Sequence, residues 1–328
     1  MKNIVDIFVE LGHRLASLTT SEGDGIITAA IEQNAWFTRP DIVRAIEAIQ
    51  EEMLDADKLM AWYDSYPHTT APKRVAIVMA GNIPLVGFFD LLCVLCSGNE
   101  AYVKPSSKDR VLMEYVIAEL RAIDSTIPIY TYSAEEHYDI AIATGGDQAN
   151  DYFRSHFEGT RRLLRGSRHS VALLDGNESE EELSSLITDI TAYSGLGCRS
   201  ISMLFMPRTM TLSLPHTAPA NPKLRNNIAA RRALYTLQQH PFSDYGAFIA
   251  LEQSSFPQSL AEVSIVHYDD ISEAKACIEA HREEVQCVVS HADVANAIPF
   301  GKAQYPTLWD YADGVDTMKF LSEGHNSE

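Results

Sequence analysis

The strongest constraint on the fold is the alternation of short apolar runs with helix-like segments between residues 71 and 290. The first two runs are Arg74–Ala80 and Glu100–Val103, and the largely apolar segment Leu85–Cys96 lies between them. Continuous apolar runs of this length are typical of parallel strands that are buried on both faces. Strands that alternate with helices favour a parallel sheet covered by helices on both sides, so the sequence predicts the α/β class.

Changes in the pattern of apolar and polar residues along the chain predict four segments. Residues 1–70 are helical in pattern and polar-faced, and predict an arm that packs on the next domain. Residues 71–190 carry the first strand–helix alternation and predict a cofactor-binding domain. A second α/β unit begins near Cys198 and predicts a catalytic domain over 191–300. The remaining residues, 301–328, are predicted to be a C-terminal segment that returns to the active-site side.

Composition narrows the class of protein. Of 328 residues, 46% are hydrophobic and 22% are charged, as is ordinary for a soluble globular protein. The net charge of −19 argues against a nucleic-acid partner, because phosphate binding needs clustered lysine and arginine. No apolar run reaches the ~18–20 residues of a membrane span. The N-terminus lacks the apolar core of a signal peptide, and the cysteines are odd in number, so we expect a cytoplasmic protein.

Cys198 is the candidate nucleophile. It follows Gly195 and Gly197, at the junction between a helical segment and the apolar run Ile201–Met206. Glycines there allow a tight turn and close approach of a ligand to the backbone. Most free cysteines are buried structural residues, but the neighbouring Arg199 is a cation that would lower the thiol pKa. Position and neighbours together favour a reactive thiolate.

The other four cysteines carry no such context. Cys93 and Cys96 form a C-x-x-C pair inside an apolar helix, with no second pair to complete a zinc site. We expect them to pack in the core rather than to form a redox dithiol. Cys277 and Cys287 are interpreted as structural, and no metal site is predicted.

Three polar turns follow predicted strands at their carboxyl ends, where open α/β sheets bind ligands. In the first turn, Asn82 is either a turn residue or a side-chain amide that donates to a developing oxyanion. In the second turn, Lys104 and the two serines either bind a ribose and its phosphate or have no ligand. In the latter case the lysine is solvated and one serine caps the next helix. The third turn would bring backbone close to a pyrophosphate. The candidate cofactor-binding residues of the second and third turns are Lys104, Ser106, Ser107, Thr144, Gly145 and Gly146.

The order of these motifs resembles the aldehyde dehydrogenase superfamily. Within it, the chain is most similar to the acyl-CoA reductases related to the fatty acid reductase of bacterial bioluminescence. The resemblance covers roughly residues 71–321. The segments that carry it are GNIPLVGFFDLL, AYVKPSSKD, GLGCRSISMLFMP and FGKAQYPTLWDYADGVDTMKFL.

The resemblance implies a Rossmann-type NAD(P)-binding domain followed by a second α/β catalytic domain. It implies that Cys198 accepts the acyl group, and that Asn82 and the Cys198 backbone N–H form the oxyanion hole. Lys104 would hold the adenosine ribose. Ser107 stands where the superfamily often has an acid that grips the 2′-hydroxyl, so we expect NADPH rather than NADH as the cofactor.

One departure from the superfamily concerns hydrolysis. Hydrolytic members carry a glutamate in the segment that matches Leu163–Ser167, whereas no Asp or Glu occurs from Gly159 to Leu174. Without that base a thioester can accept hydride or exchange with a thiol. We therefore predict NADPH-dependent reduction of a fatty acyl-CoA or acyl-protein thioester to the aldehyde. His169, nearby in sequence, is either a helper in this reaction or a surface or strand-end histidine.

Three alternatives stay open at this stage. One is an aldehyde dehydrogenase that works in the oxidative direction, and another is a non-catalytic member that keeps the fold. A weaker alternative is a cysteine hydrolase or acyltransferase, which would need a histidine paired with Cys198. The chain is short for the superfamily, so its oligomerisation hairpin is expected to be trimmed, and a homo-oligomer is left undecided.

Overall fold

The computed structural model describes residues 3–69 and 71–323. It has two compact units: one contains the chain up to Ser167 together with the residues from Pro306, and the other contains Arg168–Tyr305. The predicted boundary at residue 190 is therefore corrected to 167, because the preceding strand and helix belong to the second sheet. Residues 1, 2 and 70 of the predicted arm, and 324–328 of the predicted C-terminal segment, lie outside the described residues.

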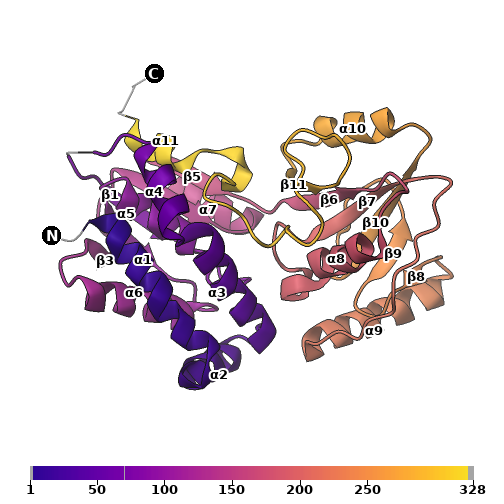
Figure 1. Cartoon of the computed structure of the whole chain (residues 1–328), viewed down its shortest axis with the longest axis horizontal. Helices are drawn as coiled ribbons and strands as arrows, with labels where there is room; N and C mark the ends of the chain where they lie inside the picture. The colour runs from indigo at the N-terminus through magenta and orange to yellow at the C-terminus, as the bar shows by residue number, and fades with distance from the viewer. Residues whose placement is uncertain (1–2, 70, 324–328) are drawn as a thin grey trace. The chain divides into compact units, whose positions relative to one another are not determined.

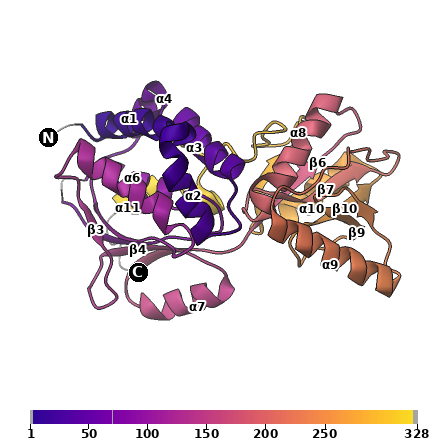
Figure 2. The same cartoon turned by 90° about the horizontal axis from the view of Figure 1, so that it is seen from below.

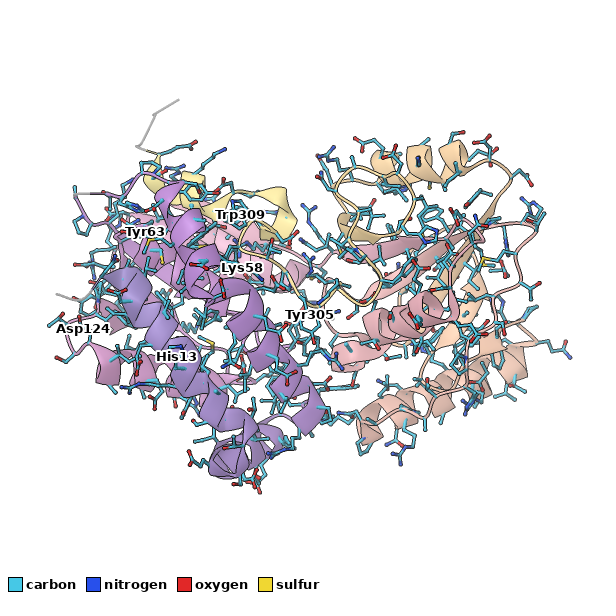
Figure 3. The ribbon with its side chains drawn as sticks, in the orientation of Figure 1. His13, Lys58, Tyr63, Asp124, Tyr305 and Trp309 are labelled. Carbon is cyan, nitrogen blue, oxygen red and sulfur yellow. The ribbon has the colours of Figure 1, made fainter. Side chains whose placement is uncertain are left out.

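Amphipathic helices form the arm at the start of the first unit. They are α1 (Ile4–Leu15), α2 (Asp24–Gln33), α3 (Arg39–Met53) and α4 (Ala56–Asp64). The pattern over Ile42–Met60 predicts one helix, but Asp55 accepts hydrogen bonds from the first backbone N–H groups of α4 and so starts a new helix. Polar side chains such as His13 and Lys58 face outward (Figure 3), while the apolar stripes share one core with the helices of the first sheet.

The first sheet has the strand order β3-β2-β1-β4-β5, and all its pairs are parallel. Its strands are β1 (Arg74–Val78), β2 (Glu100–Lys104), β3 (Ile129–Thr131), β4 (Ile140–Thr144) and β5 (Arg161–Arg165). The helices α5 (Phe88–Cys96) and α6 (Arg110–Ile123) pack with the arm on one face. Helix α7 (Asp147–His156) lies on the other face, as Figure 2 shows. This arrangement confirms the predicted parallel α/β sheet.

The C-terminal segment packs on the first unit and ends in α11 (Thr317–Ser322). A chain of hydrogen bonds runs from Trp62 Nε1 to the Tyr311 hydroxyl (2.8 Å), on to the Tyr66 hydroxyl (2.8 Å), and then to Asp316 Oδ2 (3.0 Å). A buried ion pair lies close by: Arg165 bonds Asp90 through Nη1 and Thr317 Oγ1 through Nη2. The polar residues of the DYADGVDT motif therefore serve to dock this segment.

Breaking that ion pair should destabilise the first unit strongly. Asp90 and Arg165 are both only 5% exposed, so Asp90→Ala would leave an uncompensated guanidinium in the interior. We expect a loss of about 3–5 kcal/mol in the free energy of unfolding, measured by urea denaturation. Asp64→Ala, at the exposed end of α4, serves as the control and should change stability by no more than about 0.5 kcal/mol. Equal stability of the two variants would contradict the prediction.

The second sheet has the order β11-β6-β7-β10-β9-β8, parallel except for the short edge strand. Its strands are β6 (His169–Leu173), β7 (Ile201–Pro207), β8 (Ser243–Asp244), β9 (Ile249–Glu252), β10 (Glu262–Tyr268) and β11 (Val285–Val289). Helix α8 (Glu180–Thr191) covers one face and α10 (Ile271–Ala280) the other, while α9 (Pro222–Gln238) lies at the β9 and β10 side (Figure 1). No helix of the described residues is long and apolar enough to cross a bilayer.

Candidate functional site

The nucleophile loop, residues 193–200, connects α8 to β7. Tyr193, Ser194 and Gly195 have φ values of 53°, 58° and 73°. Consecutive left-handed residues are costly when they carry side chains, and such strain persists only where the surroundings impose it. The turn reverses the chain just before Cys198, so the cysteine lies at the amino end of β7 as the sequence predicts.

Ser170 in β6 holds this loop. Its hydroxyl is fully buried and donates to the Cys198 carbonyl at 2.8 Å, and it accepts from the Cys287 backbone N–H at 3.2 Å. The Cys287 thiol lies 3.2 Å from the same oxygen. Because the contact is to the Cys198 backbone, it fixes the position of the residue without occupying its sulfur.

Exposure separates the five cysteines. Cys93 and Cys96 are 0% and 1% exposed in the core of the first unit, as predicted, and burial raises the pKa of both thiols. Cys198, Cys277 and Cys287 are partly exposed. Cys198 is therefore not sealed in hydrocarbon.

The predicted cofactor residues lie at the carboxyl edge of the first sheet. Strand β1 is paired with β2 on one side and β4 on the other, and the chain builds outward in both directions from it. Such a topological switch point is where open α/β sheets bind ligands. Asn82 follows β1, Lys104 ends β2 and Thr144 ends β4, so the three predicted turns are neighbours within this unit.

The turn that carries Asn82 is held by contacts with three other residues: Ser106, Asn34 and Asp109. A Cβ on Gly81 would lie 2.6 Å from the Ser106 side chain, so only glycine allows the first two turns to pack this closely. The Gly81 carbonyl accepts from Asn34 Nδ2 at 3.4 Å. Farther along, the Leu85 backbone N–H donates to the buried carboxyl of Asp109 at 2.8 Å, and burial raises the pKa of Asp109 to about 8.

The donors at this edge suit a dinucleotide. Lys104 and Ser107 are exposed, and Ser106 and Thr144 are partly exposed, so one cation and three hydroxyls are accessible. The Gly145 N–H is committed to the Arg165 carbonyl at 3.1 Å. Gly146 is the N-cap of α7, and a Cβ on it would meet no atom of the described residues within 4 Å, so there is open space at the start of this helix. These residues fit the phosphates and ribose of NAD(P).

The His169 side chain faces the α10 side of the second sheet. Its Nδ1 is 3.0 Å from Ser202 Oγ, its ring stacks on Phe256, and burial lowers its pKa. It lines a cavity of about 240 Å³ on the α10 face of the second sheet, together with Cys277 and His281. Cys198 is not among the residues that line this cavity.

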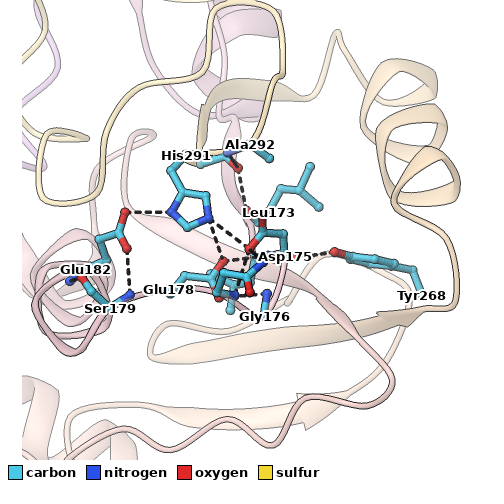
Figure 4. Close-up of polar contacts among 12 residues, drawn as sticks. Leu173, Asp175, Gly176, Glu178, Ser179, Glu182, Tyr268, His291 and Ala292 are labelled. Atoms are coloured by element: carbon cyan, nitrogen blue, oxygen red, sulfur yellow. Dashed lines mark hydrogen bonds and ion pairs between the residues drawn. The ribbon is translucent and has the colours of Figure 1, made fainter.

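The segment that follows β11 is tied to α8 through His291. Its Nδ1 lies 2.8 Å from Glu182 and its Nε2 3.0 Å from Asp175, with Glu178 3.9 Å away (Figure 4). Hydrogen bonds to Asp175 and Glu182 raise the pKa of His291 to about 9. The imidazolium thus occupies the centre of a group of carboxylates, at the carboxyl ends of β6 and β11.

Stability should follow the charge of this histidine. Its folded pKa lies above the unfolded value near 6.5, so its contribution is complete below about pH 6.5 and is lost as the pH rises through 9. Burial acts to raise the pKa of Asp175, but hydrogen bonds, first from His291, lower it overall. The pKa of Glu182 is lowered by the Ser179 backbone N–H and by His291. Asp175 and Glu182 therefore lose their contribution to the free energy of unfolding only in acid.

We therefore expect His291→Gln to lower the melting temperature by about 2–5 °C at pH 7, and by much less above pH 9.5. Differential scanning calorimetry across this range measures the difference. The control is His13→Gln, because His13 is exposed and its nearest carboxylate is 3.8 Å away. If the melting temperature of His291→Gln were lowered equally at every pH, the packing of the side chain rather than its charge would explain the loss of stability.

Sequence reasoning missed the residues that position the site. Ser170, Asp109 and Asn34 each hold a turn that carries a predicted catalytic residue, through contacts with residues that are not their neighbours in the chain. Asp109 did carry a signal, since it stands at the start of the amphipathic helical pattern over Lys108–Ile123, but an Asp there indicates a helix cap. In the structure its side chain makes no cap hydrogen bond and instead binds the Asn82 turn.

Comparison with known proteins agrees with this architecture. The family model for LuxC, acyl-CoA reductase, matches residues 13–215. No curated protein matches the chain by sequence. Among solved structures, an oxidoreductase from Marinobacter aquaeolei has a TM-score of 0.62 at 10% identity, over 90% of this chain and 74% of its own.

Two further structures show the same fold. The propionaldehyde dehydrogenase from the Clostridium phytofermentans fucose utilisation microcompartment, as its His387Ala mutant, has a TM-score of 0.59 at 11% identity, over 92% of this chain and 80% of its own. The betaine aldehyde dehydrogenase of Staphylococcus aureus, in complex with NAD+, also has a TM-score of 0.59 at 11% identity, over 90% and 72%. The fold is that of aldehyde dehydrogenases, and the chain belongs to the LuxC acyl-CoA reductase family.

Proposed function

We propose that the protein reduces a fatty acyl-CoA or acyl-protein thioester to the aldehyde with NADPH, through an acyl-enzyme on Cys198. The observation that carries the proposal is the family match, whose range includes Asn82, Lys104 and Cys198. The partial exposure of the thiol supports it. The cytoplasm is the proposed compartment, because a catalytic thiol requires reducing conditions.

NADPH would be held at the carboxyl edge of the first sheet. Lys104, Ser106 and Ser107 would bind the adenosine ribose and its 2′-phosphate, since Ser107 brings no negative charge there. Thr144, Gly145 and Gly146 would lie along the pyrophosphate. When bound, NADPH supplies the hydride that reduces the acyl group.

The chain's own residues would handle the acyl group in two stages. The Cys198 thiolate attacks the thioester carbonyl, the new C–S bond forms, and CoA leaves as a thiolate that takes a proton from solvent. The Asn82 amide and the Cys198 backbone N–H donate to the oxyanion in this step and again after reduction. Collapse of the thiohemiacetal then returns the Cys198 thiolate and releases the aldehyde.

The segment in which hydrolytic members of the superfamily carry their glutamate has no Asp or Glu here, which favours reduction over hydrolysis. In the segment from Gly159 to Leu174 the ionisable groups are cationic or imidazole, and Arg165 is committed to Asp90 and Thr317. A hydrolytic enzyme needs a base that activates water. We propose that the acyl-enzyme survives long enough to be reduced because this segment offers none.

The direct test is incubation with a panel of acyl-CoA esters of increasing chain length and either NADPH or NADH. We expect loss of absorbance at 340 nm with NADPH, one CoA released per aldehyde trapped, and much slower turnover with NADH. Free fatty acid as the main product would indicate hydrolysis. Oxidation of aldehydes by NADP without any need for CoA would favour the oxidative alternative.

A non-catalytic member is tested by thiol labelling. Three of the five thiols are partly exposed, and an activated Cys198 should react with iodoacetamide faster than Cys277 or Cys287 near neutral pH. Mass spectrometry of the peptides measures the three rates. Equal rates, together with no turnover on any ester, would support a binding protein that keeps the fold.

A further inference from the structure

The segment between β11 and the end of the second unit, residues 290–304, lies along one face of α8. His291 bonds Glu182 in the first turn of the helix. One turn later Gly301 passes so close to the helix that an added Cβ would lie 3.1 Å from the Ser185 side chain. Asp189 follows after one more turn. Residues at spacings of three, four and seven share one face of a helix, so residues 290–304 pack along a single face of α8. We call residues 290–304 the strap.

Asp189 is the anchor of the strap beside the nucleophile loop. Its side chain is 0% exposed, and its two carboxylate oxygens accept from the backbone N–H of Gly301 at 2.7 Å and of Ala303 at 3.1 Å. A fully buried carboxylate is costly unless hydrogen bonds satisfy it, and here each oxygen accepts a charge-assisted bond. The strap therefore has a defined position where it passes the end of α8.

The strap also contacts the nucleophile loop, through Ala303 and Gln304. The Ala303 carbonyl accepts from Arg199 Nε at 2.6 Å, and Gln304 Nε2 donates to Ser200 Oγ at 3.3 Å. Ala303 thus binds Asp189 through its N–H and Arg199 through its C=O, and it is itself fully buried. Arg199 and Ser200 are the two residues that directly follow Cys198.

We propose that Asp189 is a positioning residue for Cys198, acting through the strap on Arg199 and Ser200. The inference rests on the proposed role of Cys198 as nucleophile. Ser170 holds the Cys198 carbonyl from one side, and the strap holds the following residues from another, so the backbone N–H offered to the oxyanion has a fixed direction. This arrangement also explains why the FGKAQY segment, distant in sequence, accompanies the cysteine motif.

The acylation half-reaction tests the inference, because it needs no NADPH. CoA release after rapid mixing with an acyl-CoA is followed by quenching and chromatography. We expect Asp189→Asn, which keeps the volume but turns an amide N–H toward a backbone donor, to slow acylation about 10- to 100-fold. The KM should change little, and NADPH binding by fluorescence should be unchanged. Arg199→Gln, which leaves Asp189 intact, should slow acylation by a similar factor.

The matched control is His291→Gln, which loosens the far end of the strap without touching the nucleophile loop. It should lose stability but acylate at the wild-type rate well below its melting temperature. Because Asp189 and Arg199 act through the same residues, the double variant should lose less than the product of the two single losses.

The outcomes separate the inference from the proposed function. If Cys198→Ala still releases CoA at the wild-type rate, the proposed function itself fails. If Cys198→Ala is inactive while Asp189→Asn and Arg199→Gln both acylate within twofold of the wild type, only the positioning role is overturned. A loss in His291→Gln as large as that in Asp189→Asn would also overturn it, since general loosening would then explain both.

Discussion

Replacing Cys198 by alanine should abolish aldehyde formation while the protein still folds and binds NADPH. Loss of a covalent nucleophile removes the acyl-enzyme route altogether, so we expect kcat to fall by at least about 10⁴-fold. The fold should survive because Ser170 holds the backbone carbonyl of this residue and not its sulfur. Trapped aldehyde and CoA release measure the reaction, and fluorescence titration measures the cofactor.

Cys277→Ala is the matched control for this experiment. Its thiol is also partly exposed, but it lies on α10, 3.9 Å from the His281 ring, and lines the separate cavity. It should keep near-wild-type turnover. Substantial activity in Cys198→Ala would remove the mechanism, whereas equal loss in both variants would point to general damage to the second unit.

The sequence predicted the parts of the fold that depend on local pattern. The apolar runs at Val171–Leu174 and Ile201–Met206 became β6 and β7, because short uninterrupted runs of this kind are typical of strands covered on both faces. Strand β5 was missed. Three of its five residues are arginines, and its place in the sheet depends on partners elsewhere, such as Asp90 for Arg165.

The domain boundary was misplaced for a related reason. Nothing in the composition around Ser167 and Arg168 marks a border, and β5, the strand just before it, was not recognised as a strand. Strand β6 belongs to the second unit because it pairs with β7 and β11, one of which lies more than a hundred residues away in the chain. Pairing between strands distant in sequence cannot be read from a single chain.

For the site, the sequence could indicate which residues stand at strand ends but not what holds them. Cys198, Asn82 and Lys104 are at chain positions defined by the strands that precede or follow them. Their supports are contacts between residues far apart in sequence: Asp189 with Ala303, or Asn34 with Gly81. The roles of all these residues in turnover stay predictions.

Replacing Asn82 by alanine should give the second large effect. An oxyanion-hole donor stabilises charge that develops only in the transition state, and removal of one donor typically costs about 10²–10³ in rate. We expect that loss in kcat with little change in KM or in the melting temperature. The turn should keep its shape because the neighbouring Gly81 carbonyl is held by Asn34 and the Leu85 N–H by Asp109, and neither contact uses the Asn82 side chain.

The comparison that separates catalysis from structure is between Asn82→Ala and Asn34→Ala. Asn82 lies in the turn itself, whereas Asn34 is the C-cap of α2 and donates to the Gly81 carbonyl of that turn. Only Asn82 is proposed to touch the reacting carbonyl. Asn34→Ala should lower the melting temperature and leave most of the acylation rate at temperatures where the protein is folded. If Asn82→Ala acylates as fast as the wild type, the amide has no part in the oxyanion hole, and the backbone N–H of Cys198 would have to stabilise the charge without it.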